Sequence, residues 1–379
     1  MIGAGIGGLA AALALAQRGA RVRVLEQAPE IGEVGAGLQI SPNGVVVLDA
    51  LGLGEGARAR AVASRAVRLI DGPSGREVAR LDLSARDFLL FHRADLQALL
   101  LEGARAAGVE IETGRKLIGV TLEGARPRLR FKGGAEEEEV GFVVGADGLH
   151  SQLRRAINPP EEPFFTGQVA WRALVEDDGS APCEARVHMG PGRHLVAYPL
   201  RAGRLINIVA VEEREAWAAE GWFHRDDPAN LRAAFAGFGP EIQALLERVQ
   251  QVHVWGLHRH SVALEWHRGR AAILGDAAHP TLPFMAQGAV MALEDAWVLA
   301  DSLAALGLED GAALYQARRR PRAARVIEAA NRNARNYHLR ALPTRLAAHT
   351  GLRLLSRFAP ARLLARYEWI YAYDVTRDA

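Results

Sequence analysis

Apolar residues at the start of the chain recur at helical spacing and are followed by short apolar runs separated by glycine. Residues 6–18 are predicted to form a helix that ends before Gly19. Residues 94–107 are predicted to form a second, amphipathic helix. Strands are expected over residues 21–25, 109–112, 117–122 and 141–145. This alternation of helices and strands predicts an α/β unit.

The middle of the chain has a different pattern, with many short β-branched or alternating runs between turn signals. Only residues 228–236 in this part have a helical pattern. The expected strands cover residues 169–175, 194–200, 205–211 and 252–258. This pattern predicts a mostly antiparallel sheet inserted into the α/β unit, because the last third returns to a strand at 271–274 and a long helix at 287–306. Helices are expected to continue to the C-terminus.

Composition and charge narrow the class of protein. The 379 residues are 49% hydrophobic and 24% charged, which is enough to form a large core. The chain has no apolar run of about 18 residues, so we expect no membrane span. No signal-peptide pattern precedes the first glycine loop. With Cys183 as the only cysteine, we expect a cytoplasmic protein without disulfides. The arginine cluster at 318–325 lacks interleaved aromatic residues, so we expect a solvated helix face and no nucleic-acid partner.

The first candidate binding motif is the glycine-rich segment Gly3-Ala4-Gly5-Ile6-Gly7-Gly8, which matches G-x-G-x-x-G. A helix and a strand follow it, and that strand ends at Glu26, near the distance expected for a carboxylate that binds a ribose hydroxyl. Gly3, Gly5 and Gly8 would bring the backbone close to a pyrophosphate at the helix N-terminus. Only Met1 and Ile2 precede the motif, whereas a strand usually has about five residues, so we expect a loosely held cofactor.

A second motif lies in the last third of the chain, just before the long helix. It is Gly275-Asp276-Ala277-Ala278-His279-Pro280. Asp276 follows a strand and could accept a hydrogen bond from the ribityl chain of a flavin. The helix beginning at Gln287, Gly288 and Ala289 would direct its positive N-terminal end at the same ligand. Because a reduced flavin is anionic, this helix would stabilise the reduced state. No metal site is predicted.

These two motifs, together with Gly145-Ala146-Asp147-Gly148 between them, resemble those of the class A FAD-dependent aromatic hydroxylases, the para-hydroxybenzoate hydroxylase superfamily. The resemblance implies an α/β fold in which a Rossmann-like FAD-binding domain (GR2-type) is interleaved with a β-sheet substrate domain. It also implies NADH or NADPH as co-substrate, with Asp147 serving both nucleotides and Arg93 contacting the cofactor. The expected ranges are 1–66, 92–160 and 262–340 for the FAD-binding domain, 67–91 and 161–261 for the substrate domain, and 341–379 for a C-terminal helical segment.

Within this superfamily, residues 32–39, 193–201 and 367–374 are similar to segments of salicylate hydroxylases and 3-hydroxybenzoate 6-hydroxylases. The resemblance makes His194 and Tyr198 catalytic candidates that act on a substrate phenol. Residues four apart on a strand face the same side, so both side chains could line one pocket. A histidine that titrates near neutrality could take the phenol proton and make the ring a better nucleophile.

The resulting hypothesis is a monooxygenase that uses FAD, NAD(P)H and O2 to hydroxylate a small aromatic acid of the salicylate or 3-hydroxybenzoate type through a C4a-hydroperoxyflavin. Residues 281–287 come closer to 6-hydroxynicotinate 3-monooxygenase, so a 6-hydroxynicotinate- or urate-type hydroxylase is one alternative. A flavin oxidoreductase without oxygen insertion is another. Arg172 and Arg201 are both possible partners of a substrate carboxylate. The sequence is compatible with a homodimer.

Overall fold

A computed structural model of the chain describes residues 1–32, 37–134, 137–215 and 224–377. Its first layer is a mainly parallel sheet. In it β7 pairs with β1 and β11 pairs with β19, both in parallel, while β18 pairs with β19 in the antiparallel direction. Helix α1 (Ile6–Gln17) packs against the long helix α8 (Gly288–Leu306) and against α4 (Arg93–Ala106). The strands are β1 (Arg23–Leu25), β7 (Glu110–Glu112), β11 (Val143–Gly145), β18 (His267–Arg268) and β19 (Ala271–Ile273).

The two residues before the glycine loop complete this sheet at its centre. Ile2 bridges to Gly145 on one side and to Leu25 on the other, in parallel with both. Its N–H donates to the Val144 carbonyl at 2.8 Å, and its carbonyl accepts from Ala146 N–H at 2.8 Å. Two residues are therefore enough to join β1 to β11 and to place the glycine loop at the carboxyl edge of the strands.

The second layer is an eight-stranded sheet with the order β16-β17-β12-β15-β14-β13-β4-β5. The β4–β13 pair is parallel, and the other neighbours are antiparallel, as the alternating pattern predicted. Residues from far apart in the chain meet in this sheet, because β4 and β5 precede α4. The strands are β4 (Ala66–Asp71), β5 (Glu77–Asp82), β12 (Phe164–Glu176), β13 (Glu184–Gly190), β14 (Arg193–Leu200), β15 (Leu205–Glu213), β16 (His224–Asp226) and β17 (Val252–Arg259).

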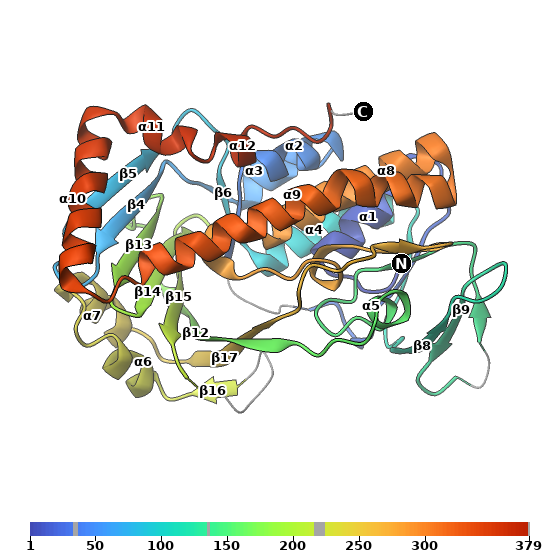
Figure 1. Cartoon of the computed structure of the whole chain (residues 1–379), viewed down its shortest axis with the longest axis horizontal. Coiled ribbons are helices and arrows are strands. Elements are labelled where there is room, and N and C mark those ends of the chain that lie inside the picture. Colours follow the sequence, from blue (N-terminus) through green and yellow to red (C-terminus); the bar gives the residue numbers. More distant parts are fainter. Residues whose placement is uncertain (33–36, 135–136, 216–223, 378–379) are drawn as a thin grey trace.

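Helices cover this sheet and link it to the first layer. The expected helix at 228–236 is α6 (Pro228–Ala234), and with α7 (Pro240–Glu247) it packs on the apolar residues of one face. The C-terminal helices are α9 (Leu308–Tyr337), α10 (Leu342–Phe358), α11 (Pro360–Ala365) and α12 (Glu368–Tyr371). Figure 1 shows α9 running along the molecule from α8 to the eight-stranded sheet, with α10 beside β5.

Smaller elements complete the chain around the two sheets. Helices α2, α3 and α5 and two three-stranded sheets lie in parts of the chain where only one element was predicted, the strand at 117–122, which is β8. These elements are β2 (Gly37–Ile40), α2 (Pro42–Ala50), α3 (Gly54–Arg60), β3 (Val62–Ala63), β6 (Leu89–His92), β8 (Leu117–Thr121), β9 (Arg128–Phe131), β10 (Glu138–Glu139) and α5 (Gln152–Ile157). Among the described residues, no helix has both the length and the apolar character needed to cross a membrane.

The prediction of a solvated arginine face at 318–325 is wrong for Arg319. This side chain is fully buried and pairs with Glu294 at 2.6 Å and with Asp295 at 2.8 Å, both on α8. Arg319 lies in the buried stripe of α9 between Tyr315 and Ala323. The helical spacing therefore placed Arg319 on the buried face of α9, although the charge of the cluster suggested a solvated face.

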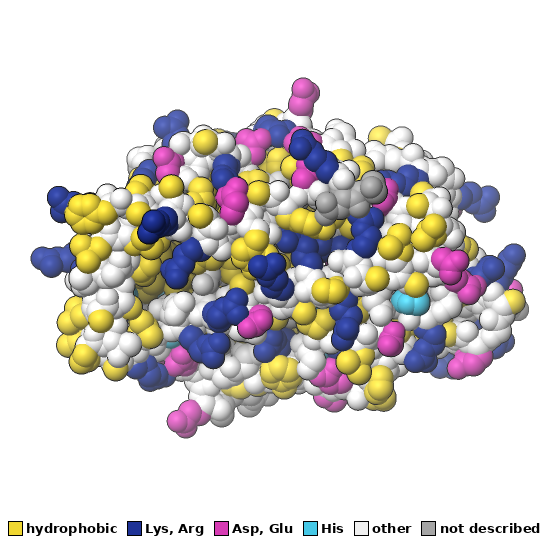
Figure 2. All heavy atoms as spheres, turned by 45° about the horizontal axis from the view of Figure 1, so that its top comes forward, with side chains coloured by type: hydrophobic (Ala, Val, Ile, Leu, Met, Phe, Trp, Pro, Cys, Tyr) yellow, Lys and Arg dark blue, Asp and Glu magenta, His cyan; other side chains and the backbone are white. Residues whose placement is uncertain are grey.

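The outer surface carries mixed charge and one apolar region. Figure 2 shows basic and acidic side chains interspersed over one face, with hydrophobic side chains gathered at the end of the molecule that holds α10. The exposed large apolar residues of that helix are Leu342, Leu346, Leu354 and Phe358.

His188 on β13 has a buried ring with no hydrogen-bond partner among the described residues. We therefore expect the protein to lose stability at acidic pH. It lies opposite Leu195, on the sheet face under α6 and α7. Burial, together with the charges of Arg186 and Arg68, lowers its pKa from 6.5 to about 3. Between these pH values the unfolded chain binds more protons, so stability is lost as the pH falls below about 6.5.

We expect the His188→Leu variant to lose less stability than the parent between pH 7 and pH 5, by about 2 kcal/mol. The leucine removes the ring that must stay neutral while leaving the packing position filled. Thermal unfolding midpoints of both proteins at pH 7 and pH 5 measure the effect. An equal decrease in the two proteins would contradict it.

Candidate active site

The glycine loop between Ile2 and α1 is shaped by close backbone contacts. Gly3 has φ +98°, and a Cβ on it would lie 2.5 Å from the Ala146 carbonyl oxygen. A Cβ on Gly8 would lie 2.0 Å from the Gly3 carbonyl oxygen. Gly5, the N-cap of α1, has open space where its side chain would be, and it lines a cavity of the protein. Gly3 and Gly8 thus make the turn possible, while Gly5 leaves the helix N-terminus accessible to an anion.

Glu26 lies at the end of β1 and holds this loop. Its carboxylate accepts hydrogen bonds from Ala4 N–H at 2.7 Å and from Ala28 N–H at 2.8 Å. Carboxylate oxygens can accept more than one hydrogen bond each, so these contacts leave capacity for a ribose hydroxyl. The ribose contact itself stays a prediction.

The second motif and α4 contribute two charges to the same cavity. Asp276 lies in the turn after β19, and its side chain is exposed to the cavity although the site is deep in the protein. Burial raises the pKa of Asp276, while His279 and Arg93 oppose this rise. Arg93 lines the cavity at the N-terminus of α4. Gly288 and Ala289 at the start of α8 also line it, so the positive end of this helix faces the same space.

We expect Asp276→Ala to weaken FAD binding by about 10-fold to 100-fold, since one hydrogen bond to a charged group contributes roughly 1.5–3 kcal/mol. Fluorescence titration of the flavin-depleted protein with FAD gives the dissociation constant. Asp310→Ala is the matched control, because Asp310 is exposed in the first turn of α9. Equal FAD affinity in the two variants would remove Asp276 from the cofactor site.

Two other residues predicted to contact the cofactor have side chains that are engaged elsewhere. The Asp147 carboxylate accepts from the Ser151 hydroxyl at 2.5 Å and from Gln152 N–H at 2.8 Å, so it caps the start of α5. The Gln287 side chain is buried and bonds with Asn43 and with the Ser41 hydroxyl. Ala146 and Gly148 line the cavity next to Asp147. Asp147 and Gln287 therefore shape the backbone around the cavity.

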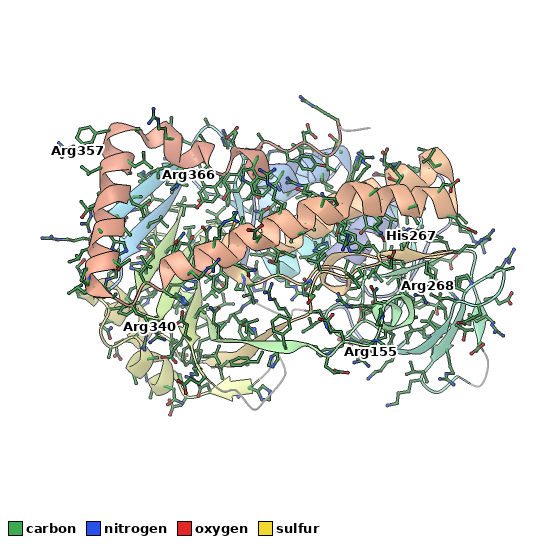
Figure 3. The ribbon with its side chains drawn as sticks, viewed as in Figure 1. Arg155, His267, Arg268, Arg340, Arg357 and Arg366 are labelled. Carbon is green, nitrogen blue, oxygen red and sulfur yellow. The ribbon has the colours of Figure 1, made fainter. Side chains whose placement is uncertain are left out.

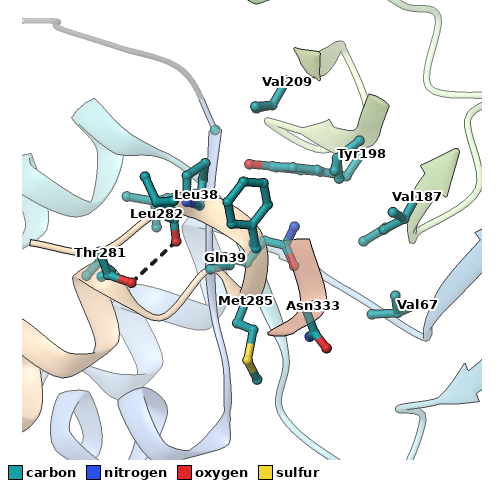
Figure 4. A pocket seen from close by; sticks show the side chains of 18 of the residues that line it. Leu38, Gln39, Val67, Val187, Tyr198, Val209, Thr281, Leu282, Met285 and Asn333 are labelled. Carbon is teal, nitrogen blue, oxygen red and sulfur yellow. Dashed lines mark hydrogen bonds between the residues drawn. The ribbon is translucent and has the colours of Figure 1, made fainter. Parts of the chain in front are cut away.

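The cavity, of about 400 Å³, extends from the glycine loop to the eight-stranded sheet. His194, Val196 and Tyr198 all line it from β14, as the strand alternation predicted. Figure 4 shows Tyr198 reaching from the sheet toward Leu38 and Leu282. The other walls are formed by apolar and aromatic side chains of several elements, including Val67, Val187, Val209, Leu282, Phe284, Met285, Tyr337 and Tyr371.

The protonation of His194 differs from the expectation of a histidine that titrates near neutrality. Burial and the neighbouring His338 lower its pKa well below 6.5, so that expectation is wrong for this structure. The ring packs against Phe284 and Tyr337, each with centroids 5.4 Å away. Burial also raises the pKa of Tyr198, so its hydroxyl keeps its proton. His194 is a neutral acceptor beside a neutral donor.

Sequence reasoning missed several residues at the sheet end of this cavity. Asn333 and Tyr337 at the end of α9 line it. His338, which is not among the lining residues, is hydrogen-bonded to His194. Leu363, Arg366 and Tyr367 line it from the C-terminal helices. The contacts join parts of the chain that are more than 100 residues apart, and no local motif reports them.

These features fit a bound FAD. An open helix N-terminus at Gly5 suits the pyrophosphate, the Asp276 carboxylate faces the cavity beyond it, and Arg93 adds a cation. The N-terminus of α8 supplies positive potential to the same space. The site therefore has the parts of a dinucleotide site that continues into a second, largely apolar pocket.

Comparison with known proteins agrees with this description. Residues 1–330 match a family model described as an FAD binding domain, and the chain belongs to this family. It is an FAD-dependent monooxygenase of the class A aromatic hydroxylase type.

Individual relatives cover nearly the whole chain. A 3-amino-4-hydroxybenzoate 2-monooxygenase of Streptomyces platensis is 34% identical over 99% of this chain and 95% of its own length. A 3-hydroxybenzoate 6-hydroxylase of Polaromonas naphthalenivorans is 34% identical over 98% of this chain and 95% of its own. The crystal structure of HpxO from Klebsiella pneumoniae complexed with FAD and uric acid has a TM-score of 0.83 and 27% identity, covering 93% of this chain and 92% of that one.

Proposed function

We propose that this enzyme hydroxylates a hydroxybenzoate-type aromatic acid, with NAD(P)H as the electron donor and O2 as the oxygen source. The observation that carries the proposal is the cavity wall on which His194, Tyr198 and Arg172 lie around an apolar space. This wall offers a base, a hydroxyl and a cation to one small molecule. The two hydroxybenzoate-directed relatives support the same substrate class.

Arg172 is the candidate partner of the substrate carboxylate. It lines the cavity from β12, and its guanidinium lies 4.6 Å from the centre of the Trp255 ring. Burial lowers its pKa to about 10, which leaves it cationic at neutral pH. A carboxylate at this position would be paired with a charge already held in a low-dielectric environment. Arg201, the other candidate, pairs with Asp95 at 2.9 Å and does not line the cavity.

Each group has a defined task in this proposal. FAD, when bound, supplies the electrons and the activated oxygen. His194 removes the phenol proton, which makes the ring electron-rich enough to attack an electrophilic oxygen. Tyr198 donates a hydrogen bond to the substrate oxygen, and Arg172 holds the carboxylate. The apolar walls exclude water, so that oxygen is transferred to the ring in preference to forming hydrogen peroxide.

A substrate screen tests the proposal. The FAD-loaded enzyme, with absorbance near 450 nm, is mixed with NADH or NADPH and salicylate, 3- or 4-hydroxybenzoate, 6-hydroxynicotinate or urate. We expect at least one hydroxybenzoate to stimulate NAD(P)H oxidation and yield a hydroxylated product. Production of hydrogen peroxide alone would indicate an oxidoreductase without oxygen insertion, and turnover of only 6-hydroxynicotinate or urate would transfer the assignment to that class.

The Arg172 assignment is tested with a matched pair of compounds. We expect Arg172→Met to weaken binding of 3-hydroxybenzoate by about 10-fold or more, since a hydrogen-bonded charge pair contributes roughly 1.5–3 kcal/mol. Binding of 3-hydroxybenzamide, which has the same ring and no charge, should change little. Perturbation of the flavin absorbance gives both dissociation constants. Equal losses for the two compounds would point to general disruption of the pocket.

We also propose that the enzyme acts in the cytoplasm, where NADH and NADPH are available. Fractionation of cells that express the full chain measures this directly. Size-exclusion chromatography of the purified enzyme determines whether it forms the homodimer that the sequence allows.

A further inference from the structure

A row of hydrogen-bonded side chains leads from the substrate end of the cavity to the protein surface. His194 Nδ1 lies 2.7 Å from His338 Nε2, and His338 Nδ1 lies 2.9 Å from Glu213 Oε1. His194 is 2% exposed and His338 is 3% exposed, whereas 32% of the Glu213 side chain is exposed. The other Glu213 oxygen pairs with Arg340 at 2.7 Å, and Figure 3 shows Arg340 beyond the end of α9.

Glu213 determines which ring nitrogen carries the proton in each of the two histidines. An ionised carboxylate only accepts hydrogen bonds, so the proton on His338 must be on Nδ1. His338 Nε2 is then an acceptor, and the short contact with it requires the proton of His194 to be on Nδ1. His194 Nε2 consequently carries a lone pair, and no described residue is hydrogen-bonded to it. The ring lines the cavity, so this lone pair is available to a ligand there.

We propose that His338 and Glu213 form a proton relay that keeps His194 in the basic tautomer and moves one proton from the substrate site to the partly exposed Glu213 carboxylate. This inference rests on the proposed function, because the proton belongs to a substrate phenol. The phenol O–H bond breaks and its proton binds His194 Nε2. The Nδ1 proton of His194 passes to His338 Nε2, and the Nδ1 proton of His338 passes to Glu213. The product ring regains its aromaticity when the hydroxylated carbon loses its proton to water; the reverse transfers then return one proton to the original phenol oxygen and restore both tautomers.

The surroundings explain why such a relay is needed. His194 lies between the Phe284 and Tyr337 rings, and the charges that act on His338 are those of Glu213, Arg340 and Arg193. A cationic His194 would be buried among aromatic rings, which is costly unless its charge is passed on. Arg193 is paired with Glu212 at 3.1 Å, so Glu213 is the anion that faces His338.

The tautomer is measured without turnover. Long-range proton–nitrogen NMR spectra of the FAD-loaded enzyme, with 15N-labelled histidine, report which ring nitrogen of His194 is protonated, and His194→Asn assigns its signal. We expect protonation at Nδ1. A signal showing protonation at Nε2 would overturn the relay, whatever the enzyme hydroxylates.

The transfer is measured in Glu213→Gln with 3-hydroxybenzoate as the probe, because glutamine cannot take up a proton. We expect the rate of hydroxylation to fall about 10-fold at pH 7 and to recover as the pH rises, with the dissociation constant of 3-hydroxybenzoate nearly unchanged. Glu212→Gln is the matched control, since its carboxylate pairs with Arg193 and Arg214 outside the relay. Equal rates in the two variants at every pH would overturn the relay.

The two failures are distinguishable. If the parent enzyme hydroxylates none of the aromatic acids but His194 carries its proton on Nδ1, the proposed substrate class is wrong and the tautomer part of the relay stands. If the parent enzyme hydroxylates 3-hydroxybenzoate but Glu213→Gln matches Glu212→Gln, the function stands and the relay is wrong.

Discussion

Replacing His194 by alanine is expected to lower the rate of hydroxylation by about 100-fold to 10,000-fold, the usual contribution of a general base. FAD content should stay the same, because His194 lies at the sheet end of the cavity while the glycine loop and Asp276 lie at the other. The phenol would then have to ionise without an internal acceptor, and water is largely excluded from the apolar pocket. Rapid-reaction kinetics with the substrate found in the screen, together with product analysis, measure the loss and the coupling to NAD(P)H oxidation.

His188→Leu is the matched control for this experiment. His188 is also a buried histidine, on the strand next to β14, but it faces α6 and α7 on the opposite side of the sheet. Its loss should leave the rate within about twofold of the parent. If His194→Ala keeps the parent rate and coupling, or if both variants lose activity to the same extent, His194 is not the base.

Arg319→Met is expected to destabilise the protein by about 3–5 kcal/mol, because the substitution leaves the buried Asp295 carboxylate without its arginine, while Glu294 keeps its pair with Arg322. Glu294 and Asp295 are both fully buried, and each pairs with Arg319. Asp295 also accepts from Gly275 N–H at 3.0 Å and contacts His279, so the disturbance should reach the Asp276 turn. We therefore expect a lower unfolding midpoint and a lower FAD content. Thermal unfolding and the absorbance ratio of flavin to protein measure the two effects.

Arg332→Met on the same helix is the control for this change. Arg332 pairs with Glu328 on the surface, with 51% of its side chain exposed, and such pairs contribute about 0–1 kcal/mol. A stability loss in Arg319→Met that stays within about 1 kcal/mol of the Arg332→Met value would show that the buried cluster tolerates an unpaired charge.

Local patterns were sufficient to predict the fold class and the cofactor motifs. Strand alternation placed His194 and Tyr198 on one face, and helical periodicity predicted α1, α4 and α8 within a few residues. The glycine spacing pointed to a dinucleotide turn, and Gly3 and Gly8 do lie where a side chain would collide with backbone. These features depend on neighbours in the chain, so the sequence reports them directly.

The environment of each charged group could not be derived in this way. Arg319 has a buried pair of carboxylates because α8 and α9 pack together, although its neighbours in sequence suggested a solvated face. The choice of Arg172 over Arg201 depended on which of them the folded chain turns toward the cavity. The low pKa of His194 depends on burial and on His338, which is 144 positions away in the chain.

The sequence by itself determined that this protein is an α/β enzyme with a dinucleotide turn and a strand that presents His194 and Tyr198. The tertiary structure alone decided how those side chains are charged and what they contact. Hydrophobic periodicity and turn chemistry act over a few residues, whereas burial, pairing and proton position depend on segments that meet only after folding. The row of His194, His338 and Glu213 joins β14, the end of α9 and β15, and only the folded chain brings these three together.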